Sequence, residues 1–221
     1  MKDNKRLHYT IDQLMSMNLR YRAAFVNSLS GFKSIALIGS TNNAGQTNLA
    51  IFNSFVHIGA NPPYIGFISR PDTTDRHTLS NILETGQYTI NHIHEGIYQQ
   101  AHQTSARYTR EQSEFDATGL TAEYKSNLIA PFVKESHIQL GIVFKEAINI
   151  TSHNTVLVVG EINHVYFPAD CLCEDGYLDI EKAASITCSG LDSYHKTERL
   201  ARLSYAKPDQ TLNTLKLSYL E

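Results

Sequence analysis

The chain contains no tryptophan and only three cysteines among its 221 residues. An odd number of thiols argues against a disulfide framework, and the spacing Cys171-Leu-Cys173 is not the Cys-x-x-Cys spacing of redox or zinc sites. We therefore expect Cys171, Cys173 and Cys188 to be buried thiols that behave as small hydrophobic residues.

Long hydrophobic runs are also missing. No apolar stretch approaches the roughly 18–20 residues that a membrane helix needs, and residues 1–22 lack the apolar segment of a signal peptide. Hydrophobic residues still make up 42% of the chain against 19% charged residues, which excludes disorder. These features predict a soluble, globular, cytoplasmic protein.

A strongly basic surface is absent as well. The chain has 19 Lys and Arg against 22 Asp and Glu, and residues 1–33 hold only a scattered excess of positive charge. Binding to a nucleic-acid backbone normally requires a clustered basic stripe. We expect no nucleic-acid partner and no membrane partner.

Several catalytic motifs are missing. The sequence has no Gly-x-Ser-x-Gly elbow, no Walker loop and no Gly-x-Gly-x-x-Gly, so covalent hydrolysis and Rossmann-type cofactor binding are disfavoured. His92 and His94 lie two residues apart, which places both imidazoles on one face of a strand. A metal-dependent β-barrel enzyme is thus a remote alternative, although no other segment supplies a matching ligand motif.

Short segments rich in β-branched and aromatic residues dominate the chain. They predict strands at Ser34–Thr41, Asn48–Ile58, Tyr64–Arg70, Gln87–Ile93, His137–Ile150 and Thr155–Phe167. The last is apolar on both faces, which is typical of a central strand. The pattern predicts a mainly β fold, a barrel or sandwich with helical decorations.

One helix is expected between these strands. Leu79, Ile82 and Leu83 share a helical face, and Gly86 stands where a C-cap glycine belongs. Residues 95–127 are expected to be helix or loop, and the tail from Asp179 mixes helical periodicity with a turn at residues 189–195. We expect a single domain over residues 1–221, with a barrel core at about 20–168 and a C-terminal extension at 169–221.

Two segments carry candidate binding chemistry. Arg70, Arg76, His77 and Thr78 surround a helix N-terminus, where backbone N–H groups and cations could hold a phosphate monoester; a capped helix with surface cations is the alternative. Asn53 and Ser54 interrupt an apolar strand, where they could face a polar ligand edge or make a cross-strand hydrogen bond.

Taken in order, several stretches resemble one known family. They are Lys33–Thr41 (KSIALIGST), Asn48–Phe55 (NLAIFNSF), Asn61–Arg70 (NPPYIGFISR), His77–Ile82 (HTLSNI), Gly86–Asn91 (GQYTIN) and Val158–Ile162 (VVGEI). Over about residues 20–168 the chain resembles the flavin reductase-like FMN-binding split barrels, in particular the flavoredoxin-type branch.

The resemblance implies a split β-barrel that forms a homodimer and binds FMN non-covalently near the subunit interface. It also implies an oxidoreductase in which NAD(P)H is a transient hydride donor to the flavin. Matching positions imply a flavin ring and ribityl site at Gly39, Ser40, Thr41, Asn53, Ser54 and Phe55, and a phosphate site at Arg70, Thr78 and Asn81. Asn48, Ser69, Arg76 and His77 complete the candidate set.

One departure from the family concerns a histidine. Many members carry Gly-Asp-His shortly before the late Gly-Glu strand, whereas Thr155 holds the matching register here and His153 lies two residues earlier. A two-residue slip would keep the same face of the strand. Two hypotheses therefore stay open, a flavin reductase and a non-catalytic FMN-binding module or flavin carrier.

Overall fold

The computed structural model describes residues 6–70 and 77–220, so the candidate residue Arg76 lies outside the described residues. Its centre is a seven-stranded sheet in the order β3-β2-β6-β9-β10-β5-β4, in which all neighbouring strands are antiparallel. The strands are β2 (Ala36–Thr41), β3 (Thr47–Phe52), β4 (Phe55–Ala60), β5 (Pro63–Ser69), β6 (Gln87–His92), β9 (Gln139–Ile150) and β10 (Thr155–Tyr166). This confirms the mainly β expectation.

Two apolar clusters hold the sheet together. One lies within the curve of the sheet, where Ile38, Phe67, Tyr88 and Ile142 are completely buried. The other lies on the opposite side of β2 and β3, against α4 (Tyr98–Gln103) and α5 (Glu114–Thr118). Because β2 contributes to both clusters, all six of its residues are buried. β2 is therefore buried on both of its faces, as expected for a central strand.

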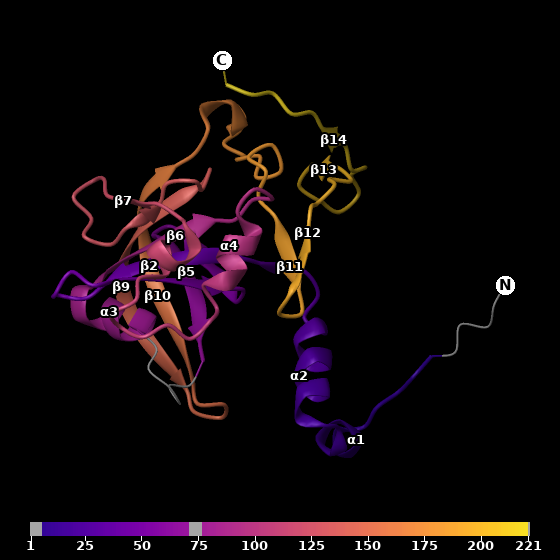
Figure 1. The fold of residues 1–221 in the computed structure, drawn as a ribbon. Helices are drawn as coiled ribbons and strands as arrows, with labels where there is room; N and C mark the ends of the chain where they lie inside the picture. The colour runs from indigo at the N-terminus through magenta and orange to yellow at the C-terminus, as the bar shows by residue number, and fades with distance from the viewer. Residues whose placement is uncertain (1–5, 71–76, 221) are drawn as a thin grey trace.

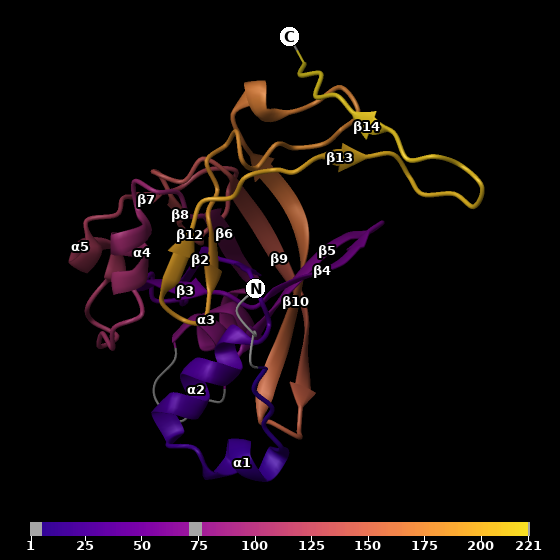
Figure 2. The same ribbon diagram turned by 90° about the vertical axis from the view of Figure 1, so that its right-hand side faces the viewer.

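The β9–β10 hairpin is the longest element, with 12 residues in each strand (Figures 1 and 2). From Val156 to Glu161, β10 pairs with β5 on one side and with β9 on the other. This half holds the apolar run that predicts a central strand, and Val158 and Val159 are buried there. The second half pairs with β9 alone and alternates in exposure.

The strand expected over Asn48–Ile58 is wrong in one respect. It breaks at Asn53 and Ser54 into β3 and β4, which lie at opposite ends of the sheet order. Ser54 stabilises the break, since its hydroxyl donates to the Ile68 carbonyl at 3.0 Å. The strand therefore crosses from one edge of the split barrel to the other at these two polar residues.

The expected helix is confirmed as α3 (His77–Thr85), with Ile82 fully buried. Gly86 takes the left-handed conformation (φ 71°), and its N–H donates to the Ile82 carbonyl at 2.9 Å. Residues 95–127 hold α4, α5 and the short β7 (Ala122–Glu123), which pairs with β8 (Phe132–Val133).

Both ends of the chain lie outside the sheet. At the start, α1 (Ile11–Ser16) and α2 (Leu19–Ser28) contain no buried residue, and the end of α2 approaches the sheet where Asn27 contacts Arg70 (Figure 1). Neither helix was anticipated, and the barrel strands begin at Ala36 rather than at about residue 20. No helix among the described residues is long and apolar enough to span a membrane.

The C-terminal segment is not helical, contrary to the periodicity seen from Asp179. After η1 (Ala169–Cys171) it forms β11 (Thr187–Ser189), β12 (Ser193–His195), β13 (Arg202–Leu203) and β14 (Thr214–Leu215). β11 pairs with β1 (Lys33–Ser34), which joins the C-terminal segment to the start of the barrel. The carboxylate of Asp179 is buried and fixes this segment by accepting from Arg199 at 2.5 Å and from the Tyr219 hydroxyl at 2.7 Å.

Candidate functional site

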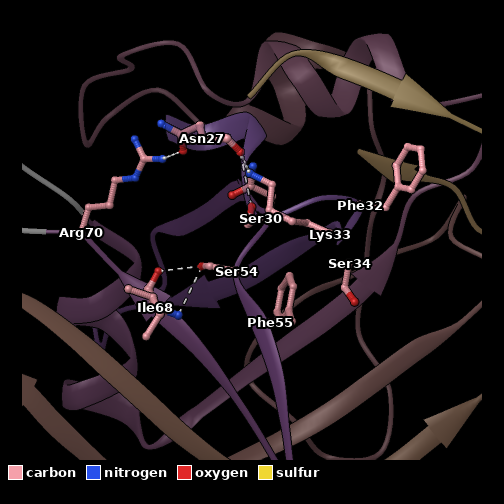
Figure 3. A pocket seen from close by; sticks show the side chains of 10 residues that line it. Asn27, Ser30, Phe32, Lys33, Ser34, Ser54, Phe55, Ile68 and Arg70 are labelled. Atoms are coloured by element: carbon pink, nitrogen blue, oxygen red, sulfur yellow. Dashed lines mark hydrogen bonds between the residues drawn. The ribbon is translucent and has the colours of Figure 1, made fainter. Parts of the chain in front are cut away.

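A pocket of about 480 Å³ opens between α2, β1 and the point where β3 passes into β4 (Figure 3). Ten residues line it: Asn27, Ser30, Phe32, Lys33, Ser34, Asn53, Ser54, Phe55, Ile68 and Arg70. Two of these described residues are cations and none is a carboxylate. The pocket therefore has the electrostatic character of a site for an anionic ligand that also carries an aromatic or apolar part.

The two cations reach the pocket from different elements. Arg70 follows β5 and donates only weakly to the Asn27 side chain, at 3.4 Å. Lys33 lies in β1, and its ammonium donates to the backbone carbonyls of Gly190 at 2.6 Å and Asn27 at 3.2 Å. Within residues 6–70 and 77–220, no carboxylate forms an ion pair with either cation.

The broken strand supplies the other polar groups. The Asn53 amide donates to the Gly190 carbonyl at 3.2 Å, so it shares an acceptor with Lys33. The Phe55 ring faces the pocket between Ser54 and Ser34 (Figure 3). The structure thus brings together four of the sequence-derived candidates, namely Asn53, Ser54, Phe55 and Arg70.

A second group of candidates is buried in a polar network and does not line the pocket. The Asn48 amide donates to the Thr78 hydroxyl at 2.9 Å, and the Asn81 amide donates to the Ser40 hydroxyl at 3.3 Å. All four side chains are at most 6% exposed. Because the Asn81 carbonyl oxygen has no partner among the described residues, the network retains one unused buried acceptor between β2 and α3.

Four further candidates also lie outside the pocket lining, and three of them are buried. Gly39 lies directly against the Pro131 carbonyl oxygen, which leaves no room for a Cβ atom at this position. Thr41 donates to the Gln46 carbonyl at 3.2 Å, and Ser69 is buried at the end of β5. His77 begins α3. None of the four lines the described pocket.

Sequence reasoning missed the N-terminal side of the pocket. Its residues are Asn27, Ser30, Phe32, Lys33, Ser34 and, from β5, Ile68. The one available signal was the excess of positive charge in residues 1–33, of which Lys33 forms part. A helix that buries nothing gives no amphipathic pattern that could point to the others.

The histidines considered as metal ligands do not converge. His92 contacts the Ser185 hydroxyl at 2.9 Å, and burial lowers the pKa of His92 to about 4. His94 stacks on His137 and contacts the Glu135 carbonyl at 3.0 Å. The described part of the chain holds no group of three potential metal-ligating side chains.

The histidine near the late strand does not reach the pocket. His153 is exposed in the turn between β9 and β10, and β10 begins at Thr155, opposite Ile150. The pairing thus leaves Thr155, which is buried, as the first residue of the strand. The free thiols are buried as expected, and burial raises the pKa of Cys188, which lies opposite Lys33 in the β1–β11 pair.

Comparison with known proteins identifies the class. The family model for the flavin reductase like domain matches residues 29–181, which is more than half of the chain. The chain belongs to this family. The fold is the split barrel of its structural neighbours, and the protein is a flavin reductase-like protein.

Three solved structures share this fold. A split barrel protein from Shewanella frigidimarina NCIMB 400, with a provisional flavin reductase assignment, is 47% identical, and the match covers 91% of this chain and 100% of that one with a TM-score of 0.88. Nitrilotriacetate monooxygenase component B from Bacillus cereus is 20% identical over 90% of this chain and 100% of that one, with a TM-score of 0.79. Flavoredoxin from Desulfovibrio vulgaris (Miyazaki F) is 22% identical over 81% and 92%, with a TM-score of 0.66.

The pocket fits a flavin mononucleotide. Its volume of about 480 Å³ is within the usual range for small-molecule sites. Its lining combines an aromatic ring, an amide and two cations, which matches a planar polar ring system joined to a phosphate.

Proposed function

We propose that the protein is an NAD(P)H-dependent flavin reductase that binds FMN non-covalently in the described pocket. The observation that carries the proposal is the pocket lining, in which Lys33 and Arg70 lie beside Asn53 and Phe55 without any described carboxylate. When bound, FMN supplies the redox chemistry, accepting a hydride from NAD(P)H, which leaves as NAD(P)⁺.

The protein's own groups would bind and orient the cofactor. We assign Arg70 to the phosphate, because a guanidinium can form paired hydrogen bonds to phosphate oxygens. Asn53, Ser54 and Phe55 would contact the ring. The buried residues Ser40, Asn48, Thr78 and Asn81 would belong to the same cofactor-binding region. Gly39, Thr41, Ser69 and His77 complete the proposed cofactor-binding region, as does Arg76, which is outside the described residues.

A homodimer is part of the proposal. Exposed apolar side chains mark the N-terminal arm, with exposed fractions of 73% at Leu7, 67% at Ile11 and 71% at Leu19. Exposed apolar surface of this kind favours burial against another chain. Light scattering on the purified protein should give twice the chain mass of 24.8 kDa. We further propose that it works in the cytoplasm, where reduced thiols and NAD(P)H coexist.

Two measurements test the reductase proposal. Excess FMN at 100 times its dissociation constant should stabilise the protein by about 2.7 kcal/mol in thermal unfolding. Anaerobic stopped-flow mixing of the FMN-loaded protein with NADH or NADPH should then bleach the flavin absorbance within seconds. A protein that neither carries flavin nor gains stability with FMN would contradict the proposal.

A second candidate function is a flavin carrier that does not turn over. It is favoured by the exposed position of His153 and by the absence of histidine among the described residues that line the pocket. FMN binding together with no bleaching by either nucleotide would identify the carrier.

A further inference from the structure

Lys33 carries a charge that the described structure leaves uncompensated. Its side chain is half-buried, and its ammonium contacts two backbone carbonyls but no carboxylate within residues 6–70 and 77–220. Asp192, two residues beyond Gly190 in the same turn, is exposed and forms no ion pair with it. An opposite charge in the pocket would stabilise this half-buried ammonium.

The contacts of Lys33 fix its position and leave it one donor. An ammonium has three N–H groups, of which two donate to Gly190 and Asn27. The third has no partner among the described residues, and Lys33 lines the pocket (Figure 3). The two carbonyls therefore hold a positively charged donor at the pocket wall without neutralising it.

A shared acceptor connects Lys33 with the ring side of the proposed site. The Gly190 carbonyl accepts from both Lys33 and Asn53, and Asn53 is the amide that we assign to the flavin ring. Arg70 reaches the pocket from β5 and contacts the Asn27 side chain at 3.4 Å, while Lys33 contacts the Asn27 backbone carbonyl. Of the two cations, Lys33 is the one that also shares an acceptor with Asn53, and we therefore assign it to the ring side of the ligand.

We propose that Lys33 is the charge-compensating residue for the anionic ring of reduced FMN, so that it raises the affinity of the pocket for reduced over oxidised flavin. The proposal rests on the proposed function. An oxidised ring that gains a hydride also gains one negative charge, and a fixed cation stabilises that form selectively. Gly190 and Asn27 act as positioning groups that hold the ammonium in place.

The test compares the dissociation constants of oxidised and reduced flavin, measured anaerobically with FMN and with riboflavin. Lys33→Met should weaken the binding of both reduced flavins about tenfold and change oxidised binding less than about twofold, as expected for one partly solvated charge. For a two-electron couple, tenfold corresponds to a midpoint potential about 30 mV lower. Lys33→Arg retains the charge and should recover most of the preference, while Lys207→Met, on the exposed surface, should change nothing.

The measurements with riboflavin distinguish binding of the flavin ring by Lys33 from binding of the phosphate, which riboflavin lacks. If Lys33→Met weakens FMN but not riboflavin, Lys33 binds the phosphate and the proposal is wrong. Equal weakening of the oxidised and reduced forms would also overturn it. If the unaltered protein binds neither flavin, the proposed function itself fails, whereas flavin binding that Lys33→Met leaves unchanged defeats only the inference about Lys33.

Discussion

The open pocket wall and the buried polar network differ although the sequence predicts them as one site. On the wall, Asn53 and Arg70 have long hydrogen bonds of 3.2 and 3.4 Å to neighbouring groups and can exchange them for a ligand. In the network, Asn48 and Thr78 are buried and paired at 2.9 Å. Exposure to the pocket rather than hydrogen-bond length separates the two groups, since Asn81 and Ser40 pair at 3.3 Å in the network and Lys33 donates to Gly190 at 2.6 Å on the wall. A ligand that enters the pocket would therefore meet the wall residues first.

We expect the largest loss of stability from a substitution at the buried residue Gly39. Gly39→Ala should destabilise the protein by about 3 kcal/mol, because the added Cβ would collide with the Pro131 carbonyl. Chemical denaturation measures the loss. Gly59→Ala is the matched control, since its Cβ would make only an ordinary contact of 3.7 Å. Equal stability of the two variants would contradict the close approach of the Pro131 carbonyl to Gly39.

Acid should destabilise the barrel through His92. Burial lowers the pKa of His92 from 6.5 to about 4, so between these values the unfolded chain binds more protons than the folded one. Stability from His92 is complete above pH 6.5 and should fall by up to about 3 kcal/mol as the pH drops to 4.

Thermal unfolding at a series of pH values measures this dependence. His92→Gln should flatten the curve in that window, and His57→Gln, at an exposed position in β4, should leave it unchanged. A His92→Gln curve that keeps the full slope would assign the acid sensitivity to another group.

Removing one hydrogen-bond partner should reduce the free energy of unfolding more in the buried network than on the pocket wall. Thr78→Val leaves the buried Asn48 amide without its acceptor and should destabilise the protein by about 2 kcal/mol. Ser54→Ala should cost less than about 1 kcal/mol, because water can replace a half-exposed hydroxyl. Urea unfolding of both variants makes the comparison, and the reverse order would contradict the division into wall and network.

The smallest predicted effect is on ligand binding alone. Arg70→Met should lower FMN affinity about tenfold and leave riboflavin affinity and thermal stability unchanged, since Arg70 has only a 3.4 Å contact with Asn27 to lose. Arg107→Met, at an exposed position, is the control. An equal loss of riboflavin affinity would show that Arg70 does not bind the phosphate, because riboflavin has none.

The strands and α3 could be predicted because their signals are local. Apolar periodicity and the C-cap Gly86 depend on neighbours in sequence, and both appear in the structure. The break at Asn53 and Ser54 could not be predicted in the same way, because it depends on Ile68, which pairs with Ser54 only after folding. Alternation along a single strand contains no information about such a partner.

The candidate site was predictable in its residue types but not in its accessibility. Resemblance to the family pointed to Asn53 and Arg70, which line the pocket, and equally to Asn48 and Asn81, which are buried and do not line it. Lys33 was missed as a site residue because its role depends on Gly190, a carbonyl in a distant turn. Every residue has a backbone carbonyl, so the sequence does not show which carbonyl accepts a particular hydrogen bond.

The Lys33–Gly190 contact also determines when the pocket can be completed during synthesis of the chain. The two residues are 157 positions apart, and a chain is synthesised from its N-terminus. The ribosome must therefore complete the barrel strands and β11 before the ammonium of Lys33 can be held at the pocket wall. Cofactor loading would then follow synthesis of nearly the whole chain, and a nascent chain that ends at β10 would present an incomplete site.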